Sequence, residues 1–359
     1  VLAQVNGRLV IADVSVMARL SEVLHAGGGG STQVMSVSEL AYYGGGTASL
    51  CRPHAEDTVM VQFSSGSMGN PRGILLTHRN LISVINSMSS ARGVKADDVF
   101  VSWLPLSHDM GLIGFHLTPL VVGARQVLMS PMEFLKRPTS WLKALHDYKA
   151  NLTGVTNSAI KRAIANTRPK FIEQLDLSSL HSLIVGAEPI SPRVMKRLIR
   201  TFKPAGLKPQ SVCPAYGLAE ASLAVTMTPL GNPPGSGQFS RSKLAQGKVS
   251  RALNSKDLVE FTNLGLPVRG TRVRIVDDAH HVLEENMVGK IEVSGDSVTK
   301  GYIGDEAATR EILNHGWLDT GDRGFLRQSQ LYFVGRDDET FFVHGRNSVS
   351  YTHLRAHET

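Results

Sequence analysis

The feature that most constrains this chain is a loop rich in serine and glycine that lies between two apolar segments. The loop covers residues 64–73 and has the sequence SSGSMGNPRG, with apolar residues concentrated at positions 58–63 before it and at 74–76 after it. These flanking segments have the composition of buried strands, and Thr77 is a suitable N-cap for a following helix. The sequence therefore predicts a loop that is held between strands of a core.

The chemistry of this loop suits a phosphate group. Glycines let the backbone approach an anion closely, and successive N–H groups can point at it. Arg72 adds a fixed positive charge, and hydrogen bonds to a charged group contribute about 1.5–3 kcal/mol each, enough for a few of them to hold a triphosphate. The other groups that we expect to contribute are the hydroxyls of Ser64, Ser65 and Ser67 and the backbone at Gly66, Gly69 and Gly73.

Two alternatives to this interpretation need to be considered. The loop is not a Walker-type P-loop, because it lacks the pattern G-x-x-x-x-G-K-[ST]. It could also be a flexible surface loop, but Pro71 and the apolar flanking segments argue against that.

The composition describes a soluble globular protein. Of the 359 residues, 42% are hydrophobic and 19% are charged, and no apolar run is long enough to span a bilayer. The two cysteines, Cys51 and Cys213, argue against a disulfide scaffold and suit a reducing cytoplasm. The net charge of +7 is dispersed rather than gathered in a stripe with aromatic residues, which speaks against nucleic-acid binding.

Beyond the loop, apolar segments of strand length alternate with amphipathic segments of helix length. This alternation predicts an α/β fold in which helices cover a mostly parallel sheet. We expect strands at residues 98–104, 126–129, 152–155, 180–185 and 211–215, and helices at residues 138–148, 157–165 and 193–202. Ligands of open α/β sheets bind beyond the carboxyl ends of the strands, so the loops at Ser64, Gly186 and Tyr216 are expected to converge.

Two short segments carry groups that suit a nucleotide and its metal. In Y-G-L-A-E, the Tyr216 ring can stack on a base, and Glu220 offers a hard oxygen ligand for Mg²⁺. Taken alone, this pattern is more often the start of a helix with a surface glutamate. In G-W-L-D-T-G-D, residues 316–322, the Asp322 carboxylate can accept hydrogen bonds from both ribose hydroxyls, although a turn aspartate is the ordinary interpretation.

The segment WLPLSHDMGLIG, residues 103–114, places His108 and Asp109 at the start of an expected helix. The pair could bind a metal, form a buried polar pair or line a pocket. Two adjacent residues cannot easily chelate one metal and no third ligand is near in the sequence, so we disfavour a metal. Farther on, residues 268–277 and 290–293 predict antiparallel strands of a separate small β subdomain.

These motifs occur in an order that resembles the adenylate-forming superfamily, the acyl-CoA synthetases and their relatives. Residues 64–73 resemble its pattern [ST]-[SG]-G-[ST]-T-G-x-P-K-G, with Met68 in place of a hydroxyl residue and Arg72 in place of lysine. The segment 103–114 is similar to one that is typical of long-chain fatty acyl-AMP ligases. The other matching motifs are residues 216–220, 289–295 with Lys290 in place of glutamate, 316–322 and 331–336.

The resemblance implies a reaction and a set of residue roles. It implies activation of a fatty acid by ATP with Mg²⁺, giving an acyl-adenylate, and transfer of the acyl group to the phosphopantetheine thiol of an acyl carrier protein. Glu220 would hold Mg²⁺, Arg72 would hold the β and γ phosphates, and His108 would lie beside the acyl carboxylate. The implied nucleotide contacts are Ser64, Ser65, Gly66, Ser67, Gly69, Gly73, Gly186, Ala187, Glu188, Ala215, Tyr216, Gly217, Asp322 and Arg336.

The resemblance also implies a domain organisation. Residues 1–262 would form an α/β AMP-binding core, incomplete at its start, in which residues 239–257 are either a surface insertion or the insertion characteristic of fatty acyl-AMP ligases. Residues 263–338 would form the β subdomain that completes the nucleotide site. Residues 339–347 would be the hinge to a missing C-terminal domain, and residues 348–359 resemble translated sequencing-adapter sequence, which we interpret as a foreign tail.

Two other functions are compatible with these motifs. The chain could be an acyl-CoA synthetase of the same fold, against which the insertion argues. It could also be a non-catalytic acyl-nucleotide binding module, which Met68, Arg72 and the expected lack of a C-terminal domain would permit.

Overall fold

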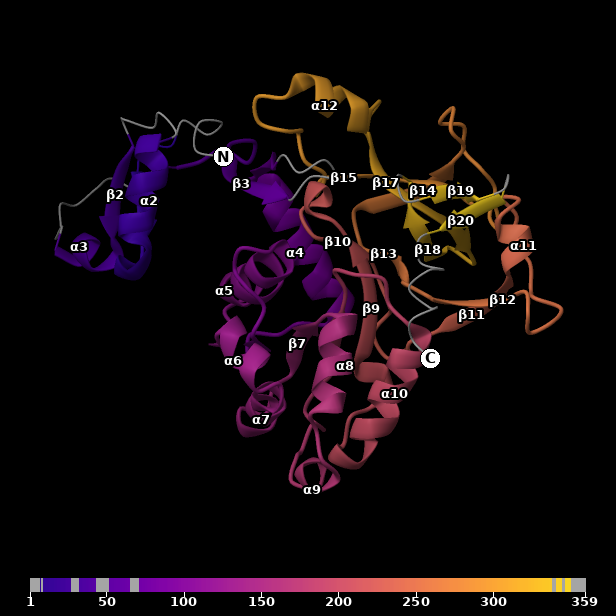
Figure 1. The fold of residues 1–359 in the computed structure, drawn as a ribbon, viewed down its shortest axis with the longest axis horizontal. Coiled ribbons are helices and arrows are strands. Elements are labelled where there is room, and N and C mark those ends of the chain that lie inside the picture. The colour runs from indigo at the N-terminus through magenta and orange to yellow at the C-terminus, as the bar shows by residue number, and fades with distance from the viewer. Residues whose placement is uncertain are drawn as a thin grey trace. The chain divides into compact units, whose positions relative to one another are not determined.

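The structure is a computed structural model, and it describes residues 7, 9–26, 32–42, 52–64, 71–337, 340–343 and 346–349 (Figure 1). The chain divides into two compact units, which are described separately. The first comprises Val1–His78 and Lys300–Thr309, and the second comprises Arg79–Thr299 and Arg310–Thr359. The predicted phosphate contacts Ser65, Gly66, Ser67 and Gly69, together with Met68, lie outside the described residues.

In the described residues of the first unit there are two small sheets. Strands β1 (Leu9–Ala12) and β2 (Gln33–Ser36) pair in parallel. In the sequence each strand is followed by a helix, α2 (Val14–Ala26) after β1 and α3 (Val37–Tyr42) after β2. Strands β3 (Thr58–Ser64) and β4 (Arg72–Thr77) form an antiparallel pair. The two strands predicted to flank the serine-glycine loop are therefore confirmed.

The prediction that both flanking strands are buried is wrong for β3. Most of β4 is buried, whereas among the residues of β3 only Gln62 is. The reason is that β4 has a neighbour on each side. Its second neighbour is a distant segment, in which the Gly301 carbonyl accepts from Leu75 N at 2.9 Å and Ile303 N donates to the Gly73 carbonyl at 2.8 Å.

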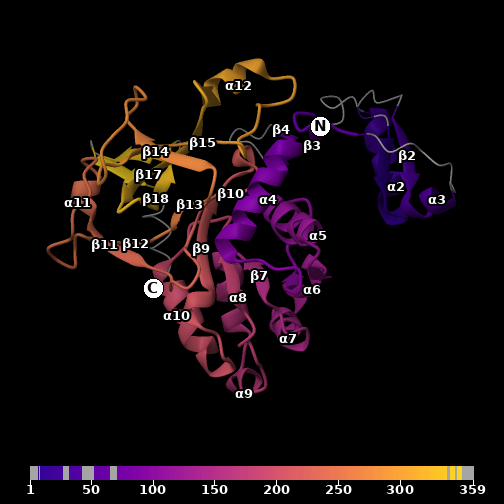
Figure 2. The ribbon, with the colours of Figure 1, turned by 180° about the vertical axis from the view of Figure 1, so that it is seen from behind.

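The second unit is built on a seven-stranded sheet with the order β13-β10-β9-β8-β7-β5-β6 (Figures 1 and 2). The pairings β5–β6, β5–β7, β7–β8 and β8–β9 are parallel, and β10 and β13 are antiparallel to their neighbours. The strands are β5 (Val99–Ser102), β6 (Arg125–Leu128), β7 (Leu152–Val155), β8 (Ser182–Val185), β9 (Val212–Gly217), β10 (Ala224–Met227) and β13 (Leu266–Pro267). The mostly parallel sheet predicted from the alternation is confirmed.

Helices pack on this sheet through the apolar faces that the sequence predicts. In α7 (Thr139–Asp147) Trp141 is fully buried, and its Nε1 donates to the Thr153 hydroxyl of β7 at 3.0 Å. Helices α8 (Asn157–Ala165) and α10 (Pro192–Phe202) lie side by side in both views (Figures 1 and 2). The remaining helices of this part are α4 (His78–Arg92), α5 (Thr118–Val122), α6 (Pro131–Lys136) and α9 (Pro169–Ile172).

The helix predicted after His108 is a π-helix, Met110–Leu117, which runs directly into α5. The Asp109 carboxylate accepts from Met110 N at 2.6 Å and so caps its start. A side chain at Gly111 would place its Cβ 2.2 Å from the Pro105 carbonyl oxygen, so this position must be glycine. Wide helical turns of this kind are frequent at functional sites.

The predicted β subdomain is a five-stranded antiparallel sheet in which β15 and β17 are central. Its strands are β14 (Thr271–Val276), β15 (Gly289–Gly295), β16 (Leu313–Asn314), β17 (Trp317–Arg327) and β18 (Gln330–Arg336). Helix α12 (Glu306–Ile312) precedes β16, and β19 (Thr340–Val343) and β20 (Arg346–Val349) form a separate antiparallel pair.

The segment in which we expected an insertion begins in regular structure. Strands β11 (Ser236–Ser240) and β12 (Leu258–Thr262) are an antiparallel pair, with α11 (Arg241–Leu244) between them in the sequence. Phe239 is fully buried among Val259, Phe325 and Tyr332, so the start of the expected insertion packs in a core, whereas residues 241–257 are exposed or partly buried. Its ring meets those of Phe325 and Tyr332 edge to face, at centroid distances of 5.1 and 5.4 Å.

We expect Phe239→Leu to destabilise the protein by about 1–2 kcal/mol, because edge-to-face pairs contribute about 0.5–1.5 kcal/mol beyond the apolar area they bury. The free energy of unfolding, measured in urea, checks this. The matched control is Leu253→Ala, since that side chain is 98% exposed. A Phe239→Leu variant as stable as the wild type would contradict the packing role.

Candidate functional site

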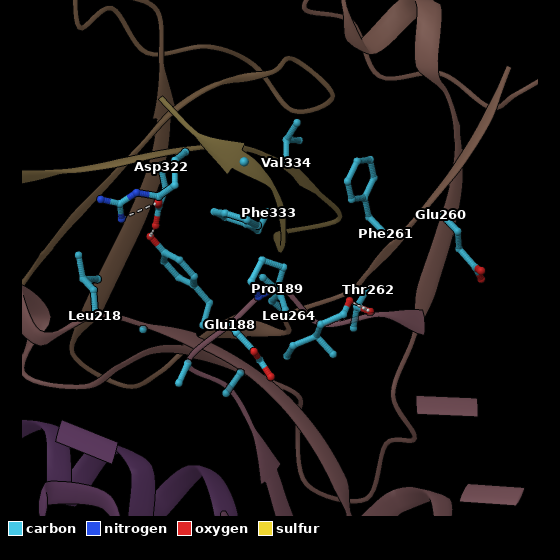
Figure 3. A pocket seen from close by; sticks show the side chains of 17 residues that line it. Glu188, Pro189, Leu218, Glu260, Phe261, Thr262, Leu264, Asp322, Phe333 and Val334 are labelled. Carbon is cyan, nitrogen blue, oxygen red and sulfur yellow. Dashed lines mark hydrogen bonds and ion pairs between the residues drawn. The ribbon is translucent and has the colours of Figure 1, made fainter. Parts of the chain in front are cut away.

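The second unit contains a cavity of about 410 Å³ at the carboxyl ends of β8 and β9, where β12 and the end of β18 also contribute (Figure 3). Seven predicted nucleotide contacts line it: Ala187, Glu188, Ala215, Tyr216, Gly217, Asp322 and Arg336. The predicted convergence of the loops at Gly186 and Tyr216 is thus observed within this unit. Ser64, Arg72 and Gly73 belong to the first unit, and their convergence with this cavity stays a prediction.

A hydrogen-bonded triad occupies one end of the cavity. The Tyr216 hydroxyl donates to Asp322 Oδ2 at 2.6 Å, and the Arg336 guanidinium donates to Asp322 Oδ1 at 3.1 Å. Asp322 and Arg336 face each other across the β17–β18 pair, whereas Tyr216 comes from β9. Tyr216 and Asp322 are buried, while about 45% of the Arg336 side chain is exposed.

Burial dominates the electrostatics of this triad. It raises the pKa of Tyr216 well above its ordinary value, and the Asp322 carboxylate adds to that shift, so the tyrosine is a neutral hydrogen-bond donor. Burial also raises the pKa of Asp322, although Tyr216 and Arg336 partly oppose this. Tyr216 and Arg336 therefore do not fully offset the cost of burying the Asp322 carboxylate. Further hydrogen-bond donors from a ligand would stabilise its charged form.

The rest of the cavity wall is mostly apolar and comes largely from residues that we did not predict. The ring planes of Tyr216 and Phe333 are inclined at 27° to each other, with centroids 6.4 Å apart. Glu260 lies on the side away from Asp322 and accepts from Lys196 at 2.7 Å (Figure 3). The unpredicted lining residues are Pro189, Ile190, Leu218, Glu260, Phe261, Thr262, Leu264, Phe333, Val334 and Gly335.

The loop after β8 is held in an unusual conformation at the cavity. Ala187 has φ +67°, a left-handed value that costs energy in a residue with a side chain. The Glu188 carboxylate accepts a hydrogen bond from the backbone N–H of Ser158 at the start of α8. Gly186 is not a lining residue, but a Cβ there would lie 3.7 Å from the Ala215 carbonyl oxygen, so the two loops run close together.

Glu220 lies in a short 3₁₀ turn, Ala219–Ala221, beyond the end of β9. Its carbonyl accepts from Thr299 N at 2.8 Å, and its carboxylate is close enough to Asp322 to help raise the pKa of that group. The glycine before the turn is required, because a Cβ at Gly217 would lie 1.8 Å from the Leu223 carbonyl oxygen. Glu220 is not among the residues that line the cavity.

His108 also lies outside the cavity lining, and its side chain is about half exposed. Its Nδ1 is 2.6 Å from Asp109 Oδ1, and this hydrogen bond raises the pKa of the imidazole despite partial burial. In the first unit, the Arg72 guanidinium lies over the Tyr302 ring, 5.3 Å from its centroid.

In the part of the chain that the structure describes, no three His, Cys, Asp or Glu side chains are grouped so as to hold a metal ion by themselves. The helices of that part include none with the length and apolarity needed to cross a membrane.

The family match and the sequence relatives of this chain agree with each other. Residues 8–303 match the family of AMP-binding enzymes. A putative fatty-acid–CoA ligase of Mycobacterium tuberculosis is 35% identical over 306 residues, which is 80% of this chain and 53% of that protein. A 4-hydroxyphenylalkanoate adenylyltransferase of Mycobacterium marinum is 32% identical over 342 residues, covering 90% of this chain and 54% of that protein.

Solved structures agree with these sequence relatives. A structure from a study of fatty acyl-adenylate ligases of E. coli and L. pneumophila superposes with a TM-score of 0.94 at 29% identity, covering 100% of this chain and 65% of that one. An L. pneumophila fatty acyl-adenylate ligase in complex with acyl adenylate and pyrophosphate gives a TM-score of 0.83 at 29% identity, covering 94% and 60%. The chain spans about half the length of the curated relatives it matches. It belongs to the AMP-binding, adenylate-forming enzyme family and has the fold of that family's large N-terminal domain, similar to that of the fatty acyl-AMP ligases.

Proposed function

We propose that this chain binds ATP and a fatty acid and, within the whole enzyme, joins them as an acyl-adenylate with release of pyrophosphate. The observation that carries the proposal is the buried Asp322 carboxylate, held between Tyr216 and Arg336 at one end of an apolar cavity. A ribose offers two adjacent hydroxyl donors, and the neighbouring rings of Tyr216 and Phe333 offer aromatic faces on which a base can stack.

The proposed roles follow the chemistry of each group. Asp322 accepts from the ribose hydroxyls, and Arg336 keeps that carboxylate in place. Tyr216 and the 186–188 loop border the adenine. The phosphate loop, with Arg72, binds the β and γ phosphates, and His108 lies beside the fatty acid carboxylate, which attacks the α-phosphorus while pyrophosphate leaves. In such a reaction the protein chiefly positions the reactants and neutralises charge.

The residues present also fit Mg²⁺ held jointly with phosphate oxygens. This ion keeps several waters and takes few protein ligands, so a single carboxylate such as Glu220 is a sufficient donor. The ion would neutralise charge on the triphosphate, and the influence of Glu220 on the pKa of Asp322 supports a place for Glu220 near the proposed nucleotide site.

We further propose that the whole enzyme passes its acyl group to the phosphopantetheine thiol of an acyl carrier protein. A competing proposal, supported by the name of one relative, a putative fatty-acid–CoA ligase, is transfer to coenzyme A. Phe239 anchors the start of the 239–257 segment in a buried cluster, so this segment begins as a folded part of the domain.

Transfer assays with a protein of the relatives' full length would decide between these acceptors. The enzyme is incubated with MgATP and a fatty acid, and pyrophosphate, acyl-adenylate and thioester are measured with either coenzyme A or phosphopantetheinylated carrier protein added. We expect adenylate formation in both cases and thioester only with the carrier protein. Efficient formation of acyl-CoA would contradict the choice of acceptor, and no acyl-adenylate at all would contradict the function.

A further inference from the structure

A network of charged side chains lies directly beside the Asp322–Arg336 pair. It consists of Lys290 on β15, Asp319 and Arg323 on β17, Asp337 just after β18, and Asp278. Successive side chains of a strand point to opposite faces, so Asp322 can enter the cavity while Arg323 enters the network. None of the network residues lines the cavity.

Asp337 is the member that joins the strands. Arg323 Nε donates to Asp337 Oδ1 at 2.5 Å, and Lys290 Nζ is 3.6 Å from Asp337 Oδ2. Lys290 Nζ also lies 3.3 Å from Asp319 Oδ2, and Arg323 pairs with Asp278. One carboxylate therefore holds cations from both β15 and β17 at the point where the chain leaves β18.

The backbone ties the network to the cavity. Asp337 N donates to the Gly321 carbonyl at 2.9 Å, and Gly321 N donates to Asp319 Oδ1 at 3.0 Å. Asp322 is consequently flanked by Gly321 and Arg323, both of which are bonded to Asp337. Arg336 immediately precedes Asp337, so the same residue limits the freedom of both partners of the cavity pair.

The charges of the network require a cation at position 290. Burial opposes the charge of Lys290, but Asp319, Asp337 and Asp278 outweigh this and raise the pKa of its amine. The motif that residues 289–295 resemble has glutamate here, and a carboxylate at this position would face Asp319 and Asp337. Lysine at 290 and aspartate at 337 therefore work as a matched pair in this chain.

We propose that Asp337, with Lys290 and Arg323, is a positioning residue that fixes Asp322 and Arg336 for recognition of the ribose. The inference rests on the proposed function, because it assigns the network a role in nucleotide binding. The side chains of Lys290, Arg323 and Asp337 are 19–33% exposed, so solvent screens these ion pairs only in part. Breaking them is expected to lower the free energy of unfolding as well, and the positioning role is therefore tested by ligand discrimination in variants that remain folded.

The test compares AMP with 2′,3′-dideoxy-AMP, which lacks both ribose hydroxyls, as calorimetric ligands of this chain. We expect the wild type to prefer AMP about tenfold or more, because Asp322 accepts from the hydroxyls that only AMP carries. Asp337→Asn and Lys290→Met are expected to weaken AMP binding about three- to tenfold and leave 2′,3′-dideoxy-AMP binding nearly unchanged, so that the preference shrinks. Lys290→Arg keeps the charge and is expected to keep the preference.

A control removes an ion pair at the surface, which is more exposed than the pairs of the network. Lys143 Nζ is 2.8 Å from Asp147 Oδ1 in α7, so Lys143→Met should leave both affinities unchanged. If Asp337→Asn and Lys290→Met retain the full preference for AMP, the positioning role is wrong. If the variants lose affinity equally for both ligands, the network has a merely structural role, and the positioning role is also wrong. A folded wild type that binds neither ligand would instead overturn the proposed function.

Discussion

Asp322→Asn is expected to make the ligand-free protein more stable at neutral pH and to weaken adenine nucleotide binding about 10- to 100-fold. Burial raises the pKa of Asp322, which means that the folded protein disfavours the charged form more than the unfolded chain does. Asparagine has the same shape, carries no charge and can still accept from the Tyr216 hydroxyl. Its amide cannot match a carboxylate as the acceptor of two ribose hydroxyls.

The raised pKa of Asp322 also predicts how the stability difference between the two proteins changes with pH. The pKa of Asp322 is higher in the folded protein than in the unfolded chain, so ionisation of this group destabilises the folded wild type. This loss of stability develops as the pH rises from the pKa of the unfolded chain through the pKa of the folded protein. The stability advantage of Asp322→Asn should therefore be absent near pH 3 and fully developed above the folded-state pKa. Thermal unfolding across this range and calorimetric titration with AMP measure the two effects.

Asp147→Asn on α7 is the control for both measurements, since that carboxylate is at the surface. If Asp322→Asn is less stable than the wild type at neutral pH, the electrostatic description of the triad is contradicted. If Asp322→Asn binds AMP as tightly as the wild type does, Asp322 is not part of the nucleotide site.

Glu220→Ala is expected to lower the rate of acyl-adenylate formation about 10²–10³-fold while the protein remains folded. The reason is that the triphosphate would lose the metal that neutralises its charge, and loss of a single electrostatic contact in the transition state has effects of this size. The fold should be retained because the side chain is only partly buried and the backbone contact to Thr299 is unaffected.

Two measurements check this role of Glu220. Adenylate formation is assayed in the full-length protein, and ATP binding to the present chain is titrated with and without Mg²⁺. We expect Mg²⁺ to tighten ATP binding in the wild type and to have little effect in Glu220→Ala. The control is Glu173→Ala, which changes an exposed glutamate. Unchanged turnover and an unchanged response to Mg²⁺ would exclude Glu220 as a ligand.

The fold was largely predictable because its signals are local. The strands around Val101, Thr153 and Ile184 are short apolar runs between helical segments, and the structure places them together in one mostly parallel sheet. Tyr216 and Asp322 were identified through motifs that resemble those of the adenylate-forming superfamily, and they meet in one cavity although more than 100 positions separate them.

The parts that were missed depend on contacts between distant segments. Phe261 and Thr262 line the cavity because β12 pairs with β11, whose Phe239 is buried against Phe325 and Tyr332. Nothing in the local pattern around Phe261 indicates that packing. The exposure of β3 was missed for a similar reason, since the neighbour that buries β4 is the segment around Tyr302.

The measurement that tests the account most directly is calorimetric binding of non-hydrolysable acyl-adenylate mimics, with acyl chains from short to long, to this chain. The mimic needs only the nucleotide cavity and an adjoining acyl site, so no further domain is required. We predict that every mimic binds, that Asp322→Asn weakens all of them, and that affinity rises with chain length until the acyl site is filled. Absence of binding by the folded protein, or binding that Asp322→Asn leaves unchanged, would contradict the assignment of this cavity as an acyl-adenylate site.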